Sequence, residues 1–546
     1  MATPISRRRV VLTGLAASVG AALPASITGC CPCNIKSSYT WNNALRIDGI
    51  DPQRVAEPGS LPELVDLVVN AESAGQRIRM VGSGHSFSDV AKTAGVLLLP
   101  TRLNRLLVLD RSQLRAECRD DRSLFRMQSG TTIRSANGLL DAQGFSLQNL
   151  GGYDGQTIVG AASTGTHGSG LDYGPIASQI VSMQVVVAGG RVLQVEPNGG
   201  ITDPNTFVSR QSIGGRTIDI ELVQDDEIWN ALSVSFGCMG VVYAVVVRTE
   251  PKYWLKEVRQ LTSWGALTTA GGFLDRLLRG EPRIEPNAAV DPAYYEIYVN
   301  PYPPKGSSGA HSHRCILTKR YKLSEKPQRL SREDRKRGRY GADFVRALAQ
   351  VTGKGEAVMS YLNAHPQAAP GVIDDSLASL EDSSYIDVSY NVFNLGPPNL
   401  IRAYGIEVGF DLQQSVTVTQ RLFEIAQELR AEGTMHNTPP SLRFVKGSNA
   451  HLAMMQGRDT MMLEMGMLVC ANKSDELLRT YETHFREELG GRPHWGLDLN
   501  TLSSFEQVRR LYPRTADRWL AVYQRLNDRG TFNGPVTDRL GISVGL

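Results

Sequence analysis

His85 stands between two glycines and two serines in the stretch RIRMVGSGHSFSDVAK, residues 77–92. An imidazole can act as a nucleophile or a proton acceptor. The glycines let the backbone bend so that successive N–H groups point at an anion. Three kinds of site have such a loop: one that cradles a phosphate, one that presents a hydrolase nucleophile, and one where a cofactor is attached.

Two common motifs fit this loop poorly. A dinucleotide-binding fingerprint needs a third glycine where helix and strand pack closely, and Phe87 occupies that position. A hydrolase elbow of the form GxSxG would use Ser86 as nucleophile, but Ser88 stands where the last glycine is required. An esterase that uses Ser86 is therefore kept only as an alternative, beside a binding protein without catalytic activity.

A second stretch dense in glycine, serine and threonine, NLGGYDGQTIVGAASTGTHGSGLDYG, covers residues 149–174. It is too long and too rich in glycine for a plain turn, so it predicts a second site lined by backbone. Two such loops on one domain can hold both ends of a dinucleotide.

The elements around these loops alternate between helix and strand. Ser60 can cap a helix that ends at Gly75, with an apolar face at Leu61, Leu64, Leu67, Val68 and Ala71. A strand over 77–81 then leads into the His85 loop. Further along, Gly189-Gly190 marks the tip of a hairpin, and a β-branched strand follows a glycine-marked turn near residue 240.

The composition limits the classes of partner and site that we expect for this chain. The chain has 546 residues, 41% of them hydrophobic and 21% charged, and a net charge of +3, which describes a globular chain and gives no reason to expect a nucleic-acid partner. Four scattered cysteines beyond residue 33 indicate neither a zinc site nor a disulfide framework. The pair His311 and His313 lacks acidic or sulfur companions, so we expect a solvated loop and no metal.

The N-terminus predicts export. Arg7, Arg8 and Arg9 precede an Ala- and Gly-rich stretch, as in a twin-arginine signal, and residues 1–29 form the predicted signal segment. The run ITGC ending at Cys30 resembles a lipoprotein cleavage box, so a lipid anchor on the outside of the cytoplasmic membrane and a free periplasmic protein both stay open. No later apolar run has the length that a bilayer requires.

Four segments together resemble a known family: VGSGHSFSD, TIVGAASTGTHGSG, FGCMGVVYAVVVR and GRPHWGLDL. They are similar to segments of the FAD-dependent oxidases of the vanillyl-alcohol oxidase and p-cresol methylhydroxylase superfamily, in the branch of the sugar 1,4-lactone oxidases and alditol oxidases. The resemblance runs from about residue 41 to the end and is strong up to about residue 250.

The resemblance implies covalent FAD, attached through His85. One link is expected, because members with two links carry a cysteine in the second glycine stretch and this chain has none there. The residues expected to line the FAD are Gly82, Ser83, Gly84, His85, Ser86, Thr157, Gly160, Ser163, Thr166, His167, Gly168 and Val242.

The resemblance also implies catalytic roles for Glu407, Arg443 and His494. Sugar-oxidising members carry Lys where this chain has Leu497, and Lys446 or Arg492 are candidates to supply the missing charge. We therefore expect oxidation of a CH–OH group in an alcohol, polyol or lactone-like substrate, with O2 or a quinone as acceptor. Because Leu497 is uncharged, a substrate bulkier or less polar than an open-chain polyol is expected, and both xylitol and a free aldonolactone are expected to be poor substrates.

The expected fold is α+β. A two-subdomain FAD-binding domain over 41–250 precedes a substrate domain over 251–491 with a large antiparallel sheet. A C-terminal segment, 492–546, is expected to return to the flavin.

Overall fold

The computed structural model describes residues 40–43, 49–307, 309–328, 358–394, 403–468, 471–499 and 501–545. The predicted signal segment 1–29 and Cys30 lie outside these residues. Within the described ranges, none of the helices combines the length and the apolar character needed to cross a bilayer.

After a two-stranded sheet of β1 (Trp41–Asn42) and β2 (Gly49–Ile50), a small parallel sheet leads into the His85 loop. Its strands are β3 (Arg54–Ala56), β5 (Val96–Leu98) and β4 (Ile78–Met80), in that order. Helix α1 (Leu61–Ser73) lies between β3 and β4 in sequence, and its Ser60 cap accepts a hydrogen bond from Glu63 N. The predicted apolar face of α1 is buried, and Gly75 has a φ of +62° just after the helix, so this part of the prediction is confirmed.

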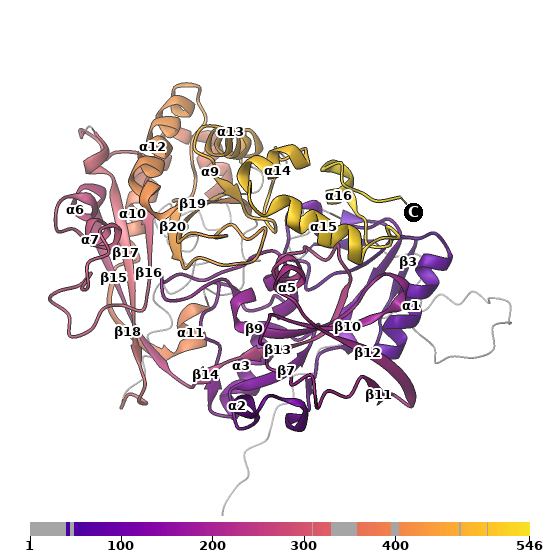
Figure 1. The fold of residues 1–546 in the computed structure, drawn as a ribbon. Helices are drawn as coiled ribbons and strands as arrows, with labels where there is room; N and C mark the ends of the chain where they lie inside the picture. Colours follow the sequence, from indigo (N-terminus) through magenta and orange to yellow (C-terminus); the bar gives the residue numbers. More distant parts are fainter. Residues whose placement is uncertain are drawn as a thin grey trace, which may run out of the picture. The chain divides into compact units, whose positions relative to one another are not determined.

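A second sheet of seven strands follows (Figure 1). In spatial order the strands are β11 (Arg210–Ile213), β12 (Arg216–Gln224), β10 (Val192–Glu196), β9 (Ile180–Val186), β13 (Val241–Arg248), β7 (Leu124–Gln128) and β6 (Leu106–Leu107). Gly189 and Gly190 join β9 to β10 with φ angles of 76° and 71°, as the hairpin prediction requires. Helices α3 (Ile133–Ala142), α4 (Ile158–Ser163) and α5 (Asp226–Ser233) contribute to its hydrophobic core.

The largest sheet has eight strands and is antiparallel throughout. In spatial order they are β18 (Asp382–Val388), β15 (Trp254–Ser263), β17 (Arg314–Leu323), β16 (Tyr294–Val299), β20 (Ser441–Val445), β21 (Thr460–Leu468), β19 (Ala403–Asp411) and β22 (Arg492–Pro493). The large antiparallel sheet after an FAD-binding-type domain confirms the predicted fold class.

Helices cover one face of this eight-stranded sheet (Figure 1). They are α6 (Trp264–Thr268), α7 (Phe273–Leu278), α12 (Ser415–Ala431) and α13 (Ser474–Glu487), and their apolar side chains pack on Ile297, Leu317, Ile406, Leu442 and Leu463. Because side chains alternate between the two faces of a strand, the neighbours of these residues point the other way. That opposite face carries Glu296, Glu407, Arg443 and Glu464.

The expectation of a solvated loop at the His-x-His pair is wrong for one of its residues. His313 is 3% exposed, its ring stacks on Phe423 with 3.6 Å between ring centroids, and its Nδ1 lies 2.9 Å from the carbonyl oxygen of Asn300. Its aromatic face fills a gap between the sheet and α12, which sequence spacing alone could not indicate.

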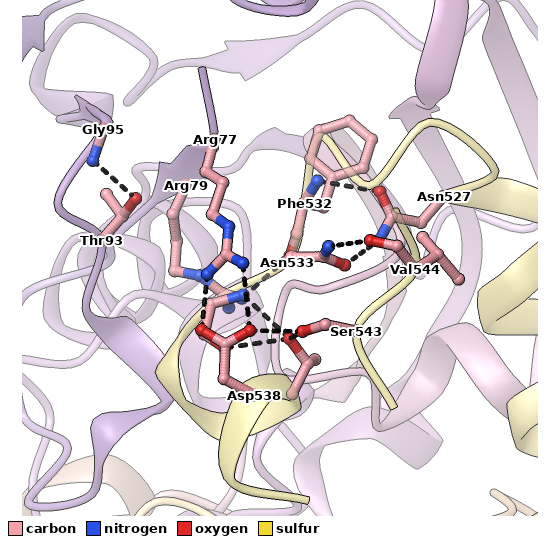
Figure 2. Close-up of polar contacts among 12 residues, drawn as sticks. Arg77, Arg79, Thr93, Gly95, Asn527, Phe532, Asn533, Asp538, Ser543 and Val544 are labelled. Atoms are coloured by element: carbon pink, nitrogen blue, oxygen red, sulfur yellow. Dashed lines mark hydrogen bonds and ion pairs between the residues drawn. The ribbon is translucent and has the colours of Figure 1, made fainter. Parts of the chain in front are cut away.

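The C-terminal helices are α14 (Phe505–Leu511), α15 (Ala516–Leu526) and α16 (Pro535–Arg539). Residues after α15 bind β4, the strand that leads into the His85 loop (Figure 2). Ile78 N donates to the carbonyl oxygen of Thr531 at 2.8 Å, and Arg77 forms a bidentate ion pair with Asp538. Beside it, the buried guanidinium of Arg79 donates to the carbonyl oxygens of Val90, Phe236 and Phe532. The chain's last residues thus stabilise the start of the loop.

Glu482 on α13 gives a stability prediction. It is 1% exposed, and burial raises its pKa from 4.5 to about 7, with Asp498 adding to the shift and Thr501 opposing it. The unfolded chain therefore loses this proton near pH 4.5 while the folded chain keeps it to about pH 7, so stability falls as pH rises through that interval. We expect Glu482→Gln to raise the unfolding free energy by on the order of 2–3 kcal/mol at pH 8 and to change it little at pH 4. Denaturant unfolding at both pH values checks this, and an equal effect at the two would contradict it.

Candidate active site

The loop after β4 brings the first group of predicted residues together. Gly84 has a φ of +75°, which favours glycine. A Cβ at Gly82 would lie 2.5 Å from Oγ1 of Thr157, so only glycine lets the two loops approach this closely. Ser83 is exposed on this loop and Ser86 is half-buried.

The hydrolase alternative does not fit this local structure. A nucleophile elbow passes directly from strand to helix. Here residues 81–88 stay irregular and lead only to a three-residue 3-10 turn, Asp89–Ala91. Ser86 therefore does not sit on the strained turn that exposes a nucleophilic serine.

The second glycine-rich stretch lies beside the first. Thr157 caps α4, where its Oγ1 accepts a hydrogen bond from Gly160 N at 3.1 Å. Ser163 ends α4, and its carbonyl oxygen accepts from Phe236 N. Thr166, His167 and Gly168 follow, and a Cβ at Gly168 would collide with Asn149 at 2.1 Å. Val242 lies in β13, paired with Val185 and packed on the main core.

His85 itself is half-buried against Tyr153, with 4.4 Å between ring centroids. Burial lowers the pKa of His85 to about 4, so the imidazole is neutral at pH 7. Within the described part of the chain, its buried Nδ1 has no hydrogen-bond partner. A neutral ring with an unused nitrogen, next to two closely apposed glycine loops, fits the attachment of a flavin nucleotide.

The HWG segment, residues 494–496, contacts this loop. Phe87 N donates to the carbonyl oxygen of Gly496 at 2.9 Å, and Ser88 Oγ donates to that of Trp495 at 2.7 Å. His494 N donates in turn to the carbonyl oxygen of Glu407 at 2.8 Å. These bonds link the His85 loop to the edge of the eight-stranded sheet.

His167, Glu407 and His494 form one buried cluster, in which a ligand-type atom of each lies within 4.8 Å of the others. Nε2 of His167 is 3.3 Å from Oε2 of Glu407. The sequence assigned His167 to the cofactor and the other two to catalysis, from three separate motifs. The structure brings all three to one place.

Hydrogen bonds fix the protons on both rings. His167 Nδ1 lies 2.8 Å from the carbonyl oxygen of Gly168, so this nitrogen donates and carries a proton. His494 Nδ1 accepts from Gly496 N at 3.0 Å, so a neutral His494 carries its proton on Nε2. A metal ion would need a lone pair on that Nε2. The residue types alone suggest a metal centre, but this tautomer favours proton and hydrogen-bond chemistry.

Arg443 supplies positive charge next to Glu407. Its guanidinium lies 2.7 Å from Oε2 of Glu464, 3.6 Å from Oε2 of Glu296 and 3.8 Å from Oε1 of Glu407. Sequence reasoning missed Glu296 and Glu464, for which the only signal is a single acidic residue within an otherwise apolar strand.

These charges set the ionisation of the cluster. Burial by itself would raise the pKa of Glu407, but His167, Arg443 and His494 lower it to about 2. Burial, reinforced by His167 and Arg443, lowers the pKa of His494 to about 4. At neutral pH the site therefore holds an ionised Glu407, a cationic Arg443 and a neutral His494 that can donate a hydrogen bond.

Neither suggested substitute for the family lysine reaches this cluster. Lys446 is exposed just after β20. Arg492 donates to the carbonyl oxygens of Leu511, Met454 and Gln456, so backbone contacts occupy its guanidinium. Leu497 is half-buried, and its N donates to the carbonyl oxygen of His494. Arg443 is the cation placed beside Glu407.

Comparison with known proteins agrees with this arrangement. Residues 52–196 match the FAD binding domain family, and residues 310–540 match the D-arabinono-1,4-lactone oxidase family. L-gulono-1,4-lactone dehydrogenase of Mycobacterium tuberculosis is 25% identical over 92% of this chain and 99% of its own length. D-arabinono-1,4-lactone oxidase of Kluyveromyces lactis is 26% identical over 44% of this chain and 42% of its own length.

Among solved structures, cholesterol oxidase from B. sterolicum superposes with a TM-score of 0.67 at 16% identity, over 93% of this chain and 97% of that one. This likeness concerns the fold. The two matched families and the full-length relative show that the chain is an FAD-dependent oxidoreductase similar to the sugar 1,4-lactone oxidases.

Proposed function

We propose that this protein oxidises a CH–OH group of a small hydroxylated molecule, a sugar lactone or a related alcohol, with FAD attached covalently through His85. The observation that carries the proposal is the convergence of His167, Glu407, His494 and Arg443 next to the loop that holds His85. The lactone substrates in the names of the relatives support the substrate class.

Different residues of the chain have different roles in the proposed reaction. When bound, FAD supplies the acceptor for the hydride that leaves the substrate carbon. Arg443 and the Nε2–H of His494 are suited to hold and polarise the substrate oxygen, because both are donors in a buried site. Glu407 stays ionised and balances the positive charge. The electron acceptor that would complete the reaction is O2 or a quinone.

The state of His85 supports the proposal of covalent attachment. Because its pKa is lowered to about 4, the ring keeps a lone pair available at neutral pH. Tyr153 packs against the ring and limits its orientation. The tight contact of Gly82 with Thr157 brings the two loops close enough to hold a dinucleotide between them.

A substrate panel tests the reaction. Anaerobic mixing with L-gulono-1,4-lactone, xylitol, an aromatic alcohol and a sterol, while the flavin absorbance is followed, reports reduction without assuming an acceptor. The names of the relatives favour the lactone as a substrate, against the expectation drawn from Leu497, so we expect the lactone to bleach the flavin. We expect xylitol to do so poorly, because Leu497 provides no charge for an open-chain polyol. Fast reduction by xylitol would contradict the inference that Leu497 makes open-chain polyols poor substrates. A colourless protein that no compound reduces would contradict the oxidoreductase itself and favour a binding protein.

We further propose that the protein is exported through its twin-arginine signal and anchored by lipid at Cys30. Such a signal carries proteins that have folded before export, which suits a chain loaded with its cofactor in the cytoplasm. We expect Cys30→Ala to move the mature protein from the membrane fraction to the soluble periplasmic fraction, because the acyl chains supply the anchor. Cys31→Ala is the matched control and should leave the protein in the membrane. Mass spectrometry that finds an unmodified N-terminus at another residue would rule out the anchor.

A further inference from the structure

Glu464 is the only charged residue of β21 (Thr460–Leu468), yet no motif singles it out. In the antiparallel register it lies directly opposite Glu407 of β19, so the two carboxylates share one face of the sheet. Their accessibility differs sharply. The side chain of Glu464 keeps 37% of its accessible surface and that of Glu407 only 4%. A molecule that enters this face can touch Glu464, whereas Glu407 is enclosed.

Two glycines leave room beside these carboxylates. Gly405 and Gly466 form the next pair on the same face of the sheet, two residues along each strand. A Cβ at Gly466 would lie 3.5 Å from Oγ1 of Thr438, in ordinary contact, and one at Gly405 would lie 3.7 Å from Cε2 of Phe87. Phe87 belongs to the His85 loop. The glycine pair next to Glu464 therefore lies against the loop that carries His85.

The contacts of Glu464 favour one free oxygen. Arg443 lies 2.7 Å from Oε2, and Ser441 Oγ donates to the same oxygen at 3.2 Å. Both neighbours therefore bind Oε2, and neither of these two contacts involves Oε1. A carboxylate held in this way can accept a hydrogen bond from a substrate hydroxyl through its second oxygen.

The pKa values of the two carboxylates also shift in opposite directions. Burial raises the pKa of Glu464, and the negative charge of Glu407 adds to this shift, while Arg443 and Ser441 oppose it. The other groups that face Glu464 are Glu296 and Tyr298 from β16. A general base works best when its pKa lies near the working pH. Glu407, with a pKa of about 2, is a weak base and is therefore poorly suited to take the substrate proton.

We propose that Glu464 is a catalytic residue that binds the reacting hydroxyl of the substrate and takes up its proton, while Arg443 holds the carboxylate in place. This inference rests on the proposed function. The O–H proton passes to Glu464, the C–H bond breaks with its electron pair passing as hydride to the FAD, and the C–O bond becomes a carbonyl. The substrate is therefore oxidised and the FAD reduced by two electrons, with one proton left on Glu464.

Flavin reduction by L-gulono-1,4-lactone tests the role. We expect Glu464→Gln to slow anaerobic bleaching by about 10²-fold or more, which is a typical contribution of a positioned base. In the parent the rate should fall as the pH drops through the raised pKa of Glu464, and this acid limb should be lost in the variant. Ser441→Ala should move the limb to higher pH, because it removes a hydrogen bond that favours the ionised form. A merely structural role for Glu464 would not move the limb in this direction.

A second measurement does not depend on turnover. Infrared difference spectra between acidic and neutral pH, recorded in a Glu482→Gln background because Glu482 also titrates near pH 7, should contain a protonated-carboxyl component that Glu464→Gln removes and Glu407→Gln keeps. A parent whose flavin the lactone fails to reduce would count against the proposed function, and the infrared band would then decide for or against Glu464. Unchanged bleaching and an unchanged acid limb in a flavin-loaded Glu464→Gln protein would overturn the inference, as would infrared difference spectra that Glu464→Gln leaves unchanged.

Discussion

The His85→Ala protein is expected to carry no covalently bound flavin. Its denatured band should not fluoresce in acid, whereas the parent band should, because His85 offers the neutral nitrogen that forms the bond. Gel fluorescence and the mass of the intact protein measure the effect directly. Noncovalent FAD can still occupy the site, since the two glycine loops are unchanged.

Two controls sharpen this experiment. His365→Ala removes an exposed histidine far along the chain and should leave the flavin bond intact. Ser86→Ala should also keep it, because the oxidoreductase makes no nucleophilic use of that serine. A fluorescent His85→Ala band would transfer the attachment to another residue. A parent without flavin would instead reject covalent attachment altogether.

The Glu407→Gln protein is expected to reduce its flavin roughly 10²-fold more slowly, as when a preorganised electrostatic group is removed from a buried site. Glu407 is the anion that faces both His167 and Arg443, so its loss leaves the guanidinium of Arg443 without this balance. Because its pKa is about 2, Glu407 remains ionised throughout the working range. The variant should therefore keep the acid limb of the pH profile, in contrast to Glu464→Gln.

Stopped-flow reduction with the lactone at several pH values measures both properties. Glu482→Gln removes a buried carboxylate outside the cluster and should reduce its flavin at the parental rate. Should Glu407→Gln keep the parental rate, the cluster would have no part in catalysis. Should it lose the acid limb, Glu407 would be the titrating base after all.

Much of the first domain could be predicted from local pattern. The apolar spacing after Ser60 identified α1, and paired glycines located the β9–β10 hairpin, because helix faces and turns depend on neighbouring residues. The motif around His85 also predicted that the backbone bends at Gly82 and Gly84. His313 was misjudged for the complementary reason: its burial depends on Phe423, 110 positions further on, which no local spacing reports.

The sequence by itself determined the cofactor class, the His85 loop and the presence of Glu407, Arg443 and His494, because each lies in a short motif whose spacing is local. Only the tertiary structure decided that His167 meets Glu407, since their segments are 240 positions apart. It also decided the surroundings of two identical side chains on adjacent strands: Glu407 is enclosed beside His167 and His494, whereas Glu464 pairs with Arg443 and is partly exposed. Ionisation depends on burial and on neighbours brought together by folding, and a sequence pattern contains neither.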